Sequence, residues 1–160
     1  MGNILTASEI VELGIQIEKN GYDFYTEVAS KSIEPKARGR FEYLAGEEKQ
    51  HISVFQEILD KVDKYEPAES YTGENKDYLN ALASENVFTR EGKGKEIARA
   101  IDSEKKAIDM AINFEKDSIN LFSVMKKAVP AQQHNIIEAL IQQEQGHLVL
   151  LVEIKQTLKI

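Results

Sequence analysis

The feature that most constrains this chain of 160 residues is an acidic pattern that occurs twice. Each copy has a lone glutamate followed, further along, by the tetrapeptide Glu-x-x-His. The copies comprise Glu18 with Glu48 and His51, and Glu115 with Glu144 and His147. Glu48 follows Glu18 by 30 residues, and Glu144 follows Glu115 by 29 residues. This agreement indicates a repeated unit that carries the same set of polar side chains in each copy.

Proline and glycine divide the chain into four long segments of helical period, 7–31, 36–63, 95–127 and 131–158. Short turns join the first segment to the second and the third to the fourth, so each pair is expected to form an antiparallel hairpin. The stretch 64–94, with one short helical pattern near 78–82, is long enough to run the length of a bundle. We therefore expect an all-α fold with one domain over residues 1–160, a four-helix bundle of two repeated hairpins joined by a long crossover. Thr6 and Glu9 form a capping-box pattern at its start.

Residues that are alternately three and four positions apart lie on one face of a helix, here called its seam. In each segment the acidic pattern lies on a seam that is otherwise apolar. The seams are Val11, Gly14, Glu18, Gly21, Tyr25 and Val28; Phe41, Leu44, Glu48, His51, Phe55 and Ile58; Ile108, Ala111, Glu115, Ser118, Phe122 and Met125; and Ile137, Leu140, Glu144, His147, Leu151 and Ile154. Four carboxylates and two imidazoles are therefore expected at mid-length in the core. The small residues beside the lone glutamates are expected to leave room next to them.

Buried carboxylates of this number need a compensating positive charge, because each ionised group loses its hydration and all four repel one another. No lysine or arginine falls on the seams near the pattern. Protons or bound cations must therefore compensate, and two divalent ions would balance four carboxylates. Glutamate and neutral histidine suit iron, manganese or zinc. The alternative is a polar layer of Glu–His salt bridges that fixes the bundle's register, which leaves too many acids for two imidazoles.

The composition excludes several classes of function. The chain has no cysteine, so it carries no disulfide, no thiolate ligand and no rubredoxin-type iron centre. Its net charge is −7 and it has no basic cluster, which argues against nucleic acid as a partner. No apolar run approaches the length of a membrane span and no secretory signal opens the chain, so we expect a cytoplasmic protein with no membrane partner.

Across all four segments the chain resembles the ferritin-like superfamily, and most closely the rubrerythrin-like di-iron proteins. The runs Glu-Lys-Asn-Gly-Tyr-Asp-Phe-Tyr, residues 18–25, and Glu-Glu-Lys-Gln-His, residues 47–51, are similar to that group. Such bundles take one Glu from each of two helices and Glu-x-x-His from each of two others. The resemblance implies two metal ions per chain, iron first, with manganese or zinc as alternatives. It implies that Glu18, Glu48 and His51 bind one ion and Glu115, Glu144 and His147 the other, with Glu48 and Glu144 bridging.

The resemblance also implies a non-haem di-iron oxidoreductase, a peroxidase or oxidase that reduces peroxide or dioxygen, and a homodimer. Because the rubredoxin module is absent, the electron donor is expected to be external, either a rubredoxin-like protein or a small reductant. Ser118 stands where typical rubrerythrins carry a further glutamate, so the six ligands are closer to a bacterioferritin-like centre. Two alternatives stay open: a ferroxidase or iron-handling protein, and a non-catalytic metal-binding regulatory bundle.

Other polar and aromatic residues lie near the seams. Tyr25 and Phe122 are each seven residues after a lone glutamate, and we expect both to pack in the core. The alternative for Tyr25 is a hydrogen bond to a ligand or a redox role. Three residues that flank the seams, Tyr22, Glu47 and Gln143, are either hydrogen-bond partners of ligands or ordinary helix-flank residues. His134 is expected to face solvent.

Overall fold

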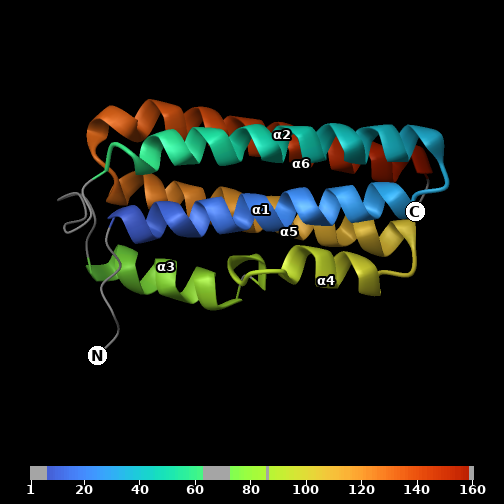
Figure 1. Ribbon diagram of the computed structural model, residues 1–160, viewed down its shortest axis with the longest axis horizontal. Coiled ribbons are helices and arrows are strands. Elements are labelled where there is room, and N and C mark those ends of the chain that lie inside the picture. Colours follow the sequence, from blue (N-terminus) through green and yellow to red (C-terminus); the bar gives the residue numbers. More distant parts are fainter. Residues whose placement is uncertain (1–6, 63–72, 86, 159–160) are drawn as a thin grey trace.

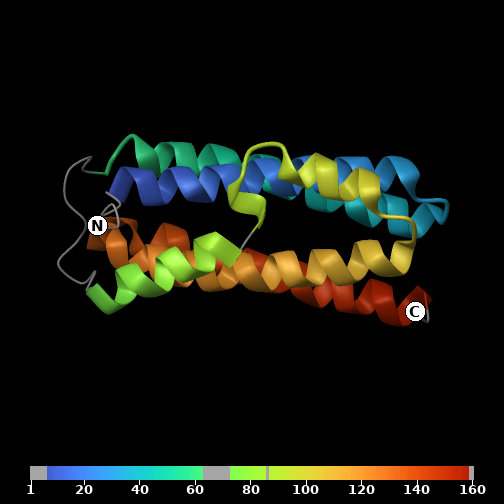
Figure 2. The same ribbon diagram turned by 90° about the horizontal axis from the view of Figure 1, so that it is seen from below.

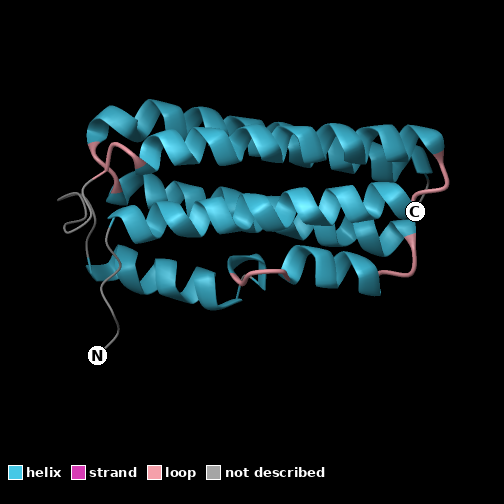
Figure 3. Ribbon diagram, in the orientation of Figure 1, coloured by secondary structure: helices cyan, strands magenta, loops and turns pink. Residues whose placement is uncertain are grey.

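The computed structural model describes residues 7–62, 73–85 and 87–158, and the regular structure in these residues is entirely helical (Figure 3). Four helices of 25 residues run along the long axis of the molecule (Figure 1). These are α1 (Ala7–Lys31), α2 (Pro35–Leu59), α5 (Glu104–Ala128) and α6 (His134–Leu158). Helix α1 packs on α2 and α5 packs on α6 as antiparallel hairpins. The predicted bundle of two hairpins joined by a long crossover is therefore confirmed.

Two shorter helices, α3 (Gly73–Glu85) and α4 (Lys93–Ala100), lie end to end in the crossover (Figure 1). Helix α3 packs on α5 and α4 packs on α1, so the crossover passes over the face formed by α1 and α5 (Figure 2). Helix α3 contains the short helical pattern expected near 78–82. Within the described residues, no helix is both long enough and apolar enough to span a bilayer.

The prediction of one continuous helix over 95–127 is wrong. Helix α4 ends at Ala100, Ile101 is extended, and α5 begins only at Glu104. The break has a local cause, because the Ser103 hydroxyl accepts a hydrogen bond from the Lys106 backbone N–H at 3.2 Å and so caps α5. The crossover therefore contains a helix that the sequence pattern merges with the bundle.

Other helix boundaries differ by a few residues from those expected. The Glu34 carboxylate accepts a hydrogen bond from the backbone N–H of Ala37 at 2.7 Å, which starts α2 at Pro35. Helix α2 ends at Leu59, not at 63, and α6 begins after a 3₁₀ turn over 131–133. Thr6, one half of the expected capping box, lies outside the described residues.

All the predicted seam residues are buried, so the apolar seams and their polar layer form the core of the bundle. The expected room beside the glycines is filled, however. A Cβ at Gly21 would lie 2.7 Å from the Phe114 ring, and one at Gly14 would lie 2.9 Å from the Met125 methyl group. These glycines let side chains of α5 and α2 approach α1 closely.

Asn20 ties the crossover to α1, and its side chain is almost completely buried. Its amide nitrogen donates to the carbonyl oxygens of Phe88 and Arg90, and its side-chain oxygen accepts from the Gly94 N–H at 3.0 Å. A Cβ at Gly94 would lie 2.0 Å from the Asn20 carbonyl oxygen, so the backbones approach as closely as only glycine permits. Three hydrogen bonds, two donated and one accepted by the same side chain, therefore hold the crossover against the bundle.

Asn20→Ala is expected to lower the free energy of unfolding by about 2–4 kcal/mol, because buried backbone groups of the crossover lose their partners. The matched control is Asn80→Ala, the same change at an exposed position of α3, with an expected effect within about 0.5 kcal/mol. Urea denaturation of both variants measures the difference. Equal effects of the two substitutions would contradict the assigned role of Asn20.

Candidate metal centre

The six side chains of the repeated acidic pattern meet at mid-length in the bundle. Glu18 comes from α1, Glu115 from α5, and each Glu-x-x-His pair from α2 or α6. All four carboxylates are 0% exposed, and the imidazoles of His51 and His147 are 1% and 4% exposed. The structure thus brings all six predicted site residues together in the core.

The donor atoms form two groups that could each hold a metal ion, and within each group the atoms lie within 4.8 Å of one another. The first group is Glu18, Glu48, His51 and Glu144, and the second is Glu48, Glu115, Glu144 and His147. Glu48 and Glu144 belong to both groups. Their shared position is the one that bridging ligands of a metal pair would occupy.

Both imidazoles point Nδ1 toward the carboxylates. His51 Nδ1 lies 2.8 Å from Glu144 Oε1 and 3.1 Å from Glu18 Oε2. His147 Nδ1 lies 3.5 Å from an oxygen of Glu48 and 3.5 Å from one of Glu144. The two rings are nearly parallel, with centroids 5.5 Å apart. Nδ1 of each histidine is therefore the atom placed to bind a metal.

The outward nitrogens of the two imidazoles have different surroundings. His51 Nε2 is hydrogen-bonded to Gln143 Oε1 at 2.7 Å. His147 Nε2 lies 3.8 Å from Glu47 Oε2, too far for a hydrogen bond. Gln143 thus fixes the ring of His51 from the opposite hairpin, whereas His147 has no hydrogen-bond partner on either ring nitrogen among the described residues.

Tyr25 packs in the core and also makes the hydrogen bond to a predicted ligand that was given as its alternative role. It is completely buried, and its hydroxyl donates a hydrogen bond to Glu115 Oε1. Phe122 packs against Phe55 with ring centroids 4.9 Å apart, as expected of a core residue. The tyrosine side chain thus reaches from α1 to a predicted ligand on α5.

The two remaining predicted residues are peripheral. Tyr22 is partly buried and packs against the core. His134 is only partly exposed, and its Nε2 is hydrogen-bonded to the carbonyl oxygen of Val129 at 3.1 Å. The expectation that His134 faces solvent is therefore correct only in part.

Without a cation, protons must balance the charge of the site. Burial and the neighbouring carboxylates raise the pKa of Glu18 and of Glu115 well above the usual value. Burial alone would lower the pKa of His51 and His147, but the carboxylates that surround both rings raise it strongly. Two protonated glutamates, two imidazolium ions and two carboxylates, Glu48 and Glu144, then make the site neutral.

This donor set fits a pair of divalent metal ions. One or both carboxylate oxygens of every glutamate in the site lack a hydrogen-bond partner among the described residues. Buried oxygens without partners are costly, and metal coordination would satisfy them. Two divalent ions supply the four positive charges that the carboxylates need, and the oxygen and nitrogen donors suit iron, manganese or zinc. About two protons should leave the site for each ion that binds.

The raised pKa values predict how stability depends on pH. The metal-free folded chain holds protons that the unfolded chain releases above about pH 4.5 for glutamate and about 6.5 for histidine. Its free energy of unfolding should therefore fall as the pH rises from about 5 to 8, by roughly 1.4 kcal/mol per pH unit for each such proton. The metal-loaded protein has exchanged these protons and should not show the fall.

Urea unfolding of both forms across this pH range measures the effect. Glu18→Gln/Glu115→Gln removes two of the titrating groups, so the metal-free variant should lose less stability per pH unit. Glu42→Gln/Glu57→Gln, which changes exposed residues of α2, should behave as the wild type. A metal-free chain that gains stability as the pH rises would contradict the assignment.

Tyr25→Phe is expected to destabilise the chain by about 1–2 kcal/mol, because Glu115 loses a buried hydrogen bond while the ring volume is kept. Tyr78→Phe makes the same change at a residue that is 49% exposed and should be neutral. Urea denaturation of the metal-free variants measures the two effects. The role of the hydroxyl would be refuted by equal stabilities of the two variants.

Comparisons with known proteins agree with this geometry. A solved structure of a protein from Thermotoga maritima, described as a ferritin-like diiron-carboxylate protein, has 25% sequence identity and a TM-score of 0.68 over 98% of each chain. The bundle is therefore ferritin-like, as expected. No curated protein gave a significant match. The family model for rubrerythrin matches residues 9–155, which include all six residues of the site. The chain thus belongs to the rubrerythrin family.

Proposed function

We propose that this protein is a non-haem di-iron oxidoreductase that reduces peroxide or dioxygen with electrons from an external donor. The observation that carries the proposal is the buried set of four carboxylates and two imidazoles, in which Glu48 and Glu144 belong to both ligand groups. Membership of the rubrerythrin family and the similarity to a protein described as diiron-carboxylate favour iron. The remaining ligands would be Glu18 and His51 for one ion and Glu115 and His147 for the other.

A bound iron pair would supply two electrons to the oxidant, and two protons would have to accompany them for peroxide to become water. Tyr25 holds a proton beside the site, because burial and the Glu115 carboxylate keep the pKa of its phenol well above the usual value. Phe41 stacks on the Tyr25 ring at 6.3 Å and Phe114 meets it edge-on at 6.2 Å. These rings pack against the tyrosine ring, and the side chain is completely buried, so bulk water does not reach the hydroxyl.

The electron donor is a separate molecule in this proposal. None of the 160 residues is a cysteine, so no iron–sulfur or rubredoxin-type centre can be built from them. The residues of the chain hold the site, orient its ligands and exclude water. Reducing equivalents then reach the site from outside the bundle.

Ser118 supports a second candidate function, oxidation of iron(II) as a substrate. It occupies the position at which typical rubrerythrins have a further glutamate, is completely buried, and its hydroxyl has no hydrogen-bond partner among the described residues. The ligand set then consists of six residues with two histidines, which is closer to a bacterioferritin-like centre. In this alternative, more iron would pass through the site than remains bound in it.

The deciding experiment measures metal content and reactivity together. Protein purified without added metal should contain about two iron ions per chain. Glu48→Gln/Glu144→Gln should lose both, whereas the control Glu42→Gln/Glu57→Gln, on the exposed side of α2, should keep them. Stopped-flow mixing of the reduced protein with peroxide should then oxidise the site rapidly, with turnover when a reductant is supplied.

Two results would reject the oxidoreductase proposal. A wild-type chain that neither contains iron nor takes up added Fe(II) would leave a structural bundle. Uptake of iron far beyond two ions per chain, without turnover of peroxide, would favour the ferroxidase alternative.

A further inference from the structure

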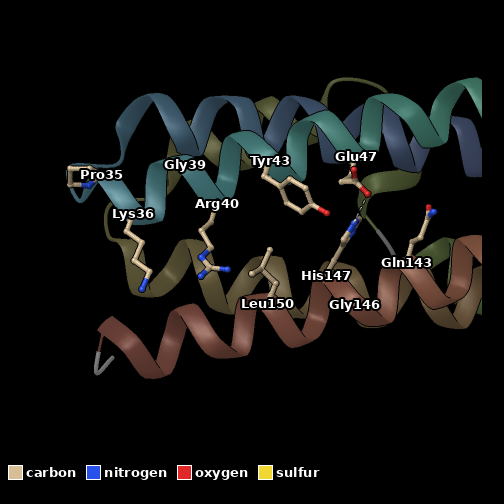
Figure 4. A pocket seen from close by; sticks show the side chains of 10 residues that line it. All are labelled: Pro35, Lys36, Gly39, Arg40, Tyr43, Glu47, Gln143, Gly146, His147 and Leu150. Atoms are coloured by element: carbon tan, nitrogen blue, oxygen red, sulfur yellow. Dashed lines mark ion pairs between the residues drawn. The ribbon is translucent and has the colours of Figure 1, made fainter.

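A groove between α2 and α6 leads along the bundle to the metal centre (Figure 4). It has a volume of about 720 Å³, within the range of roughly 300–1,000 Å³ typical of small-ligand sites. Its lining comprises Pro35, Lys36, Gly39, Arg40, Tyr43 and Glu47 from α2, and Gln143, Gly146, His147 and Leu150 from α6. The groove lies on the face of the bundle that α3 and α4 do not cover.

Two helix-interior glycines keep the groove open. A Cβ built at Gly39 or at Gly146 would have no neighbouring atom within 4 Å. Glycine inside a helix costs about 1 kcal/mol relative to alanine. Because neither glycine is required here by a close contact or by a positive φ, their effect is to leave the floor of the groove without side chains.

The outer end of the groove is positively charged. Lys36 and Arg40 lie one turn apart on α2, and both side chains extend toward α6 (Figure 4). Neither forms an ion pair with any described residue, although the chain as a whole carries a net charge of −7. Two unpaired cations on one wall form a site for an acidic group, which an arginine can bind with two hydrogen bonds.

The middle of the groove is apolar and its inner end is polar. Tyr43, which is 55% exposed, and Leu150 form the middle. At the inner end lies His147, which is 4% exposed. Its Nε2 faces Glu47 and has no hydrogen-bond partner among the described residues (Figure 4). From the helical rise, Arg40 and Lys36 lie roughly 10 and 16 Å along α2 from Glu47.

We propose that this groove binds a small organic anion with an apolar body. Its acidic group would lie at Lys36 and Arg40, and its body would lie along Tyr43 and Leu150. Its far end would then reach His147, beside the metal centre. The inference concerns binding only and goes beyond the proposed function, since it holds whichever reaction the centre performs.

The test is fluorescence titration of the full-length chain, metal-free and zinc-loaded, with 8-anilinonaphthalene-1-sulfonate, an aromatic body with one sulfonate. Saturable binding is expected, and Lys36→Gln/Arg40→Gln should weaken it by about tenfold or more. Lys61→Gln/Lys95→Gln removes two exposed cations elsewhere and should leave the affinity unchanged. N-phenyl-1-naphthylamine has the same body without the sulfonate, so its affinity should not respond to Lys36→Gln/Arg40→Gln.

Gly39→Leu provides a second test, because it fills the groove while replacing a poor helix former with a good one. It should abolish binding of both dyes without lowering the melting temperature. Binding of the sulfonate that is unaffected by both Gly39→Leu and Lys36→Gln/Arg40→Gln would overturn the proposal. Sedimentation of the dye-free proteins gives a further outcome that would overturn it. If the wild type is a dimer and Gly39→Leu is a monomer, a second copy of the chain occupies the groove. Titration of the metal-free chain keeps this outcome separate from the test of iron binding.

Discussion

The rest of the structure depends on one constraint, the mutual repulsion of four buried carboxylates that water cannot hydrate. These are the carboxylates of Glu18, Glu48, Glu115 and Glu144. Such a cluster is tolerable only if each negative charge meets a proton or a cation. The four carboxylates come from four different helices. Whatever neutralises them therefore joins both hairpins at one point, and the apolar seams above and below that point fix the register in which the helices meet.

The two sides of the bundle around this cluster differ in what covers them. On one side α3 and α4 cover α1 and α5, and the Asn20 side chain holds the crossover two residues after Glu18. The Phe114 ring fills the space beside Gly21, so α1 has packing partners on both its inner and its outer surface. Helix α1, which carries Glu18, thus contacts both the core of the bundle and the crossover.

Much of this arrangement could be predicted from the sequence, because the helical period directly determines which residues face the core. The two Glu-x-x-His motifs and the lone glutamates were placed correctly on buried seams for this reason. The break before α5 was missed, because Ser103 interrupts a pattern that otherwise continues across it. Contacts between distant segments, such as those of Asn20 with the crossover and of Tyr25 with Glu115, depend on tertiary packing and have no signal in local periodicity.

The two hairpins carry matching motifs, yet the residue before each Glu-x-x-His differs, Glu47 in one and Gln143 in the other. Gln143 holds His51 in place, whereas His147 borders the open groove without a hydrogen-bond partner among the described residues. The two halves of the site, which carry the same motif, therefore differ in their surroundings: His147 lines the groove, whereas His51 is hydrogen-bonded to Gln143. Any molecule in the groove would therefore lie beside the His147 position and not beside the His51 position, so two positions built from the same motif differ in their access.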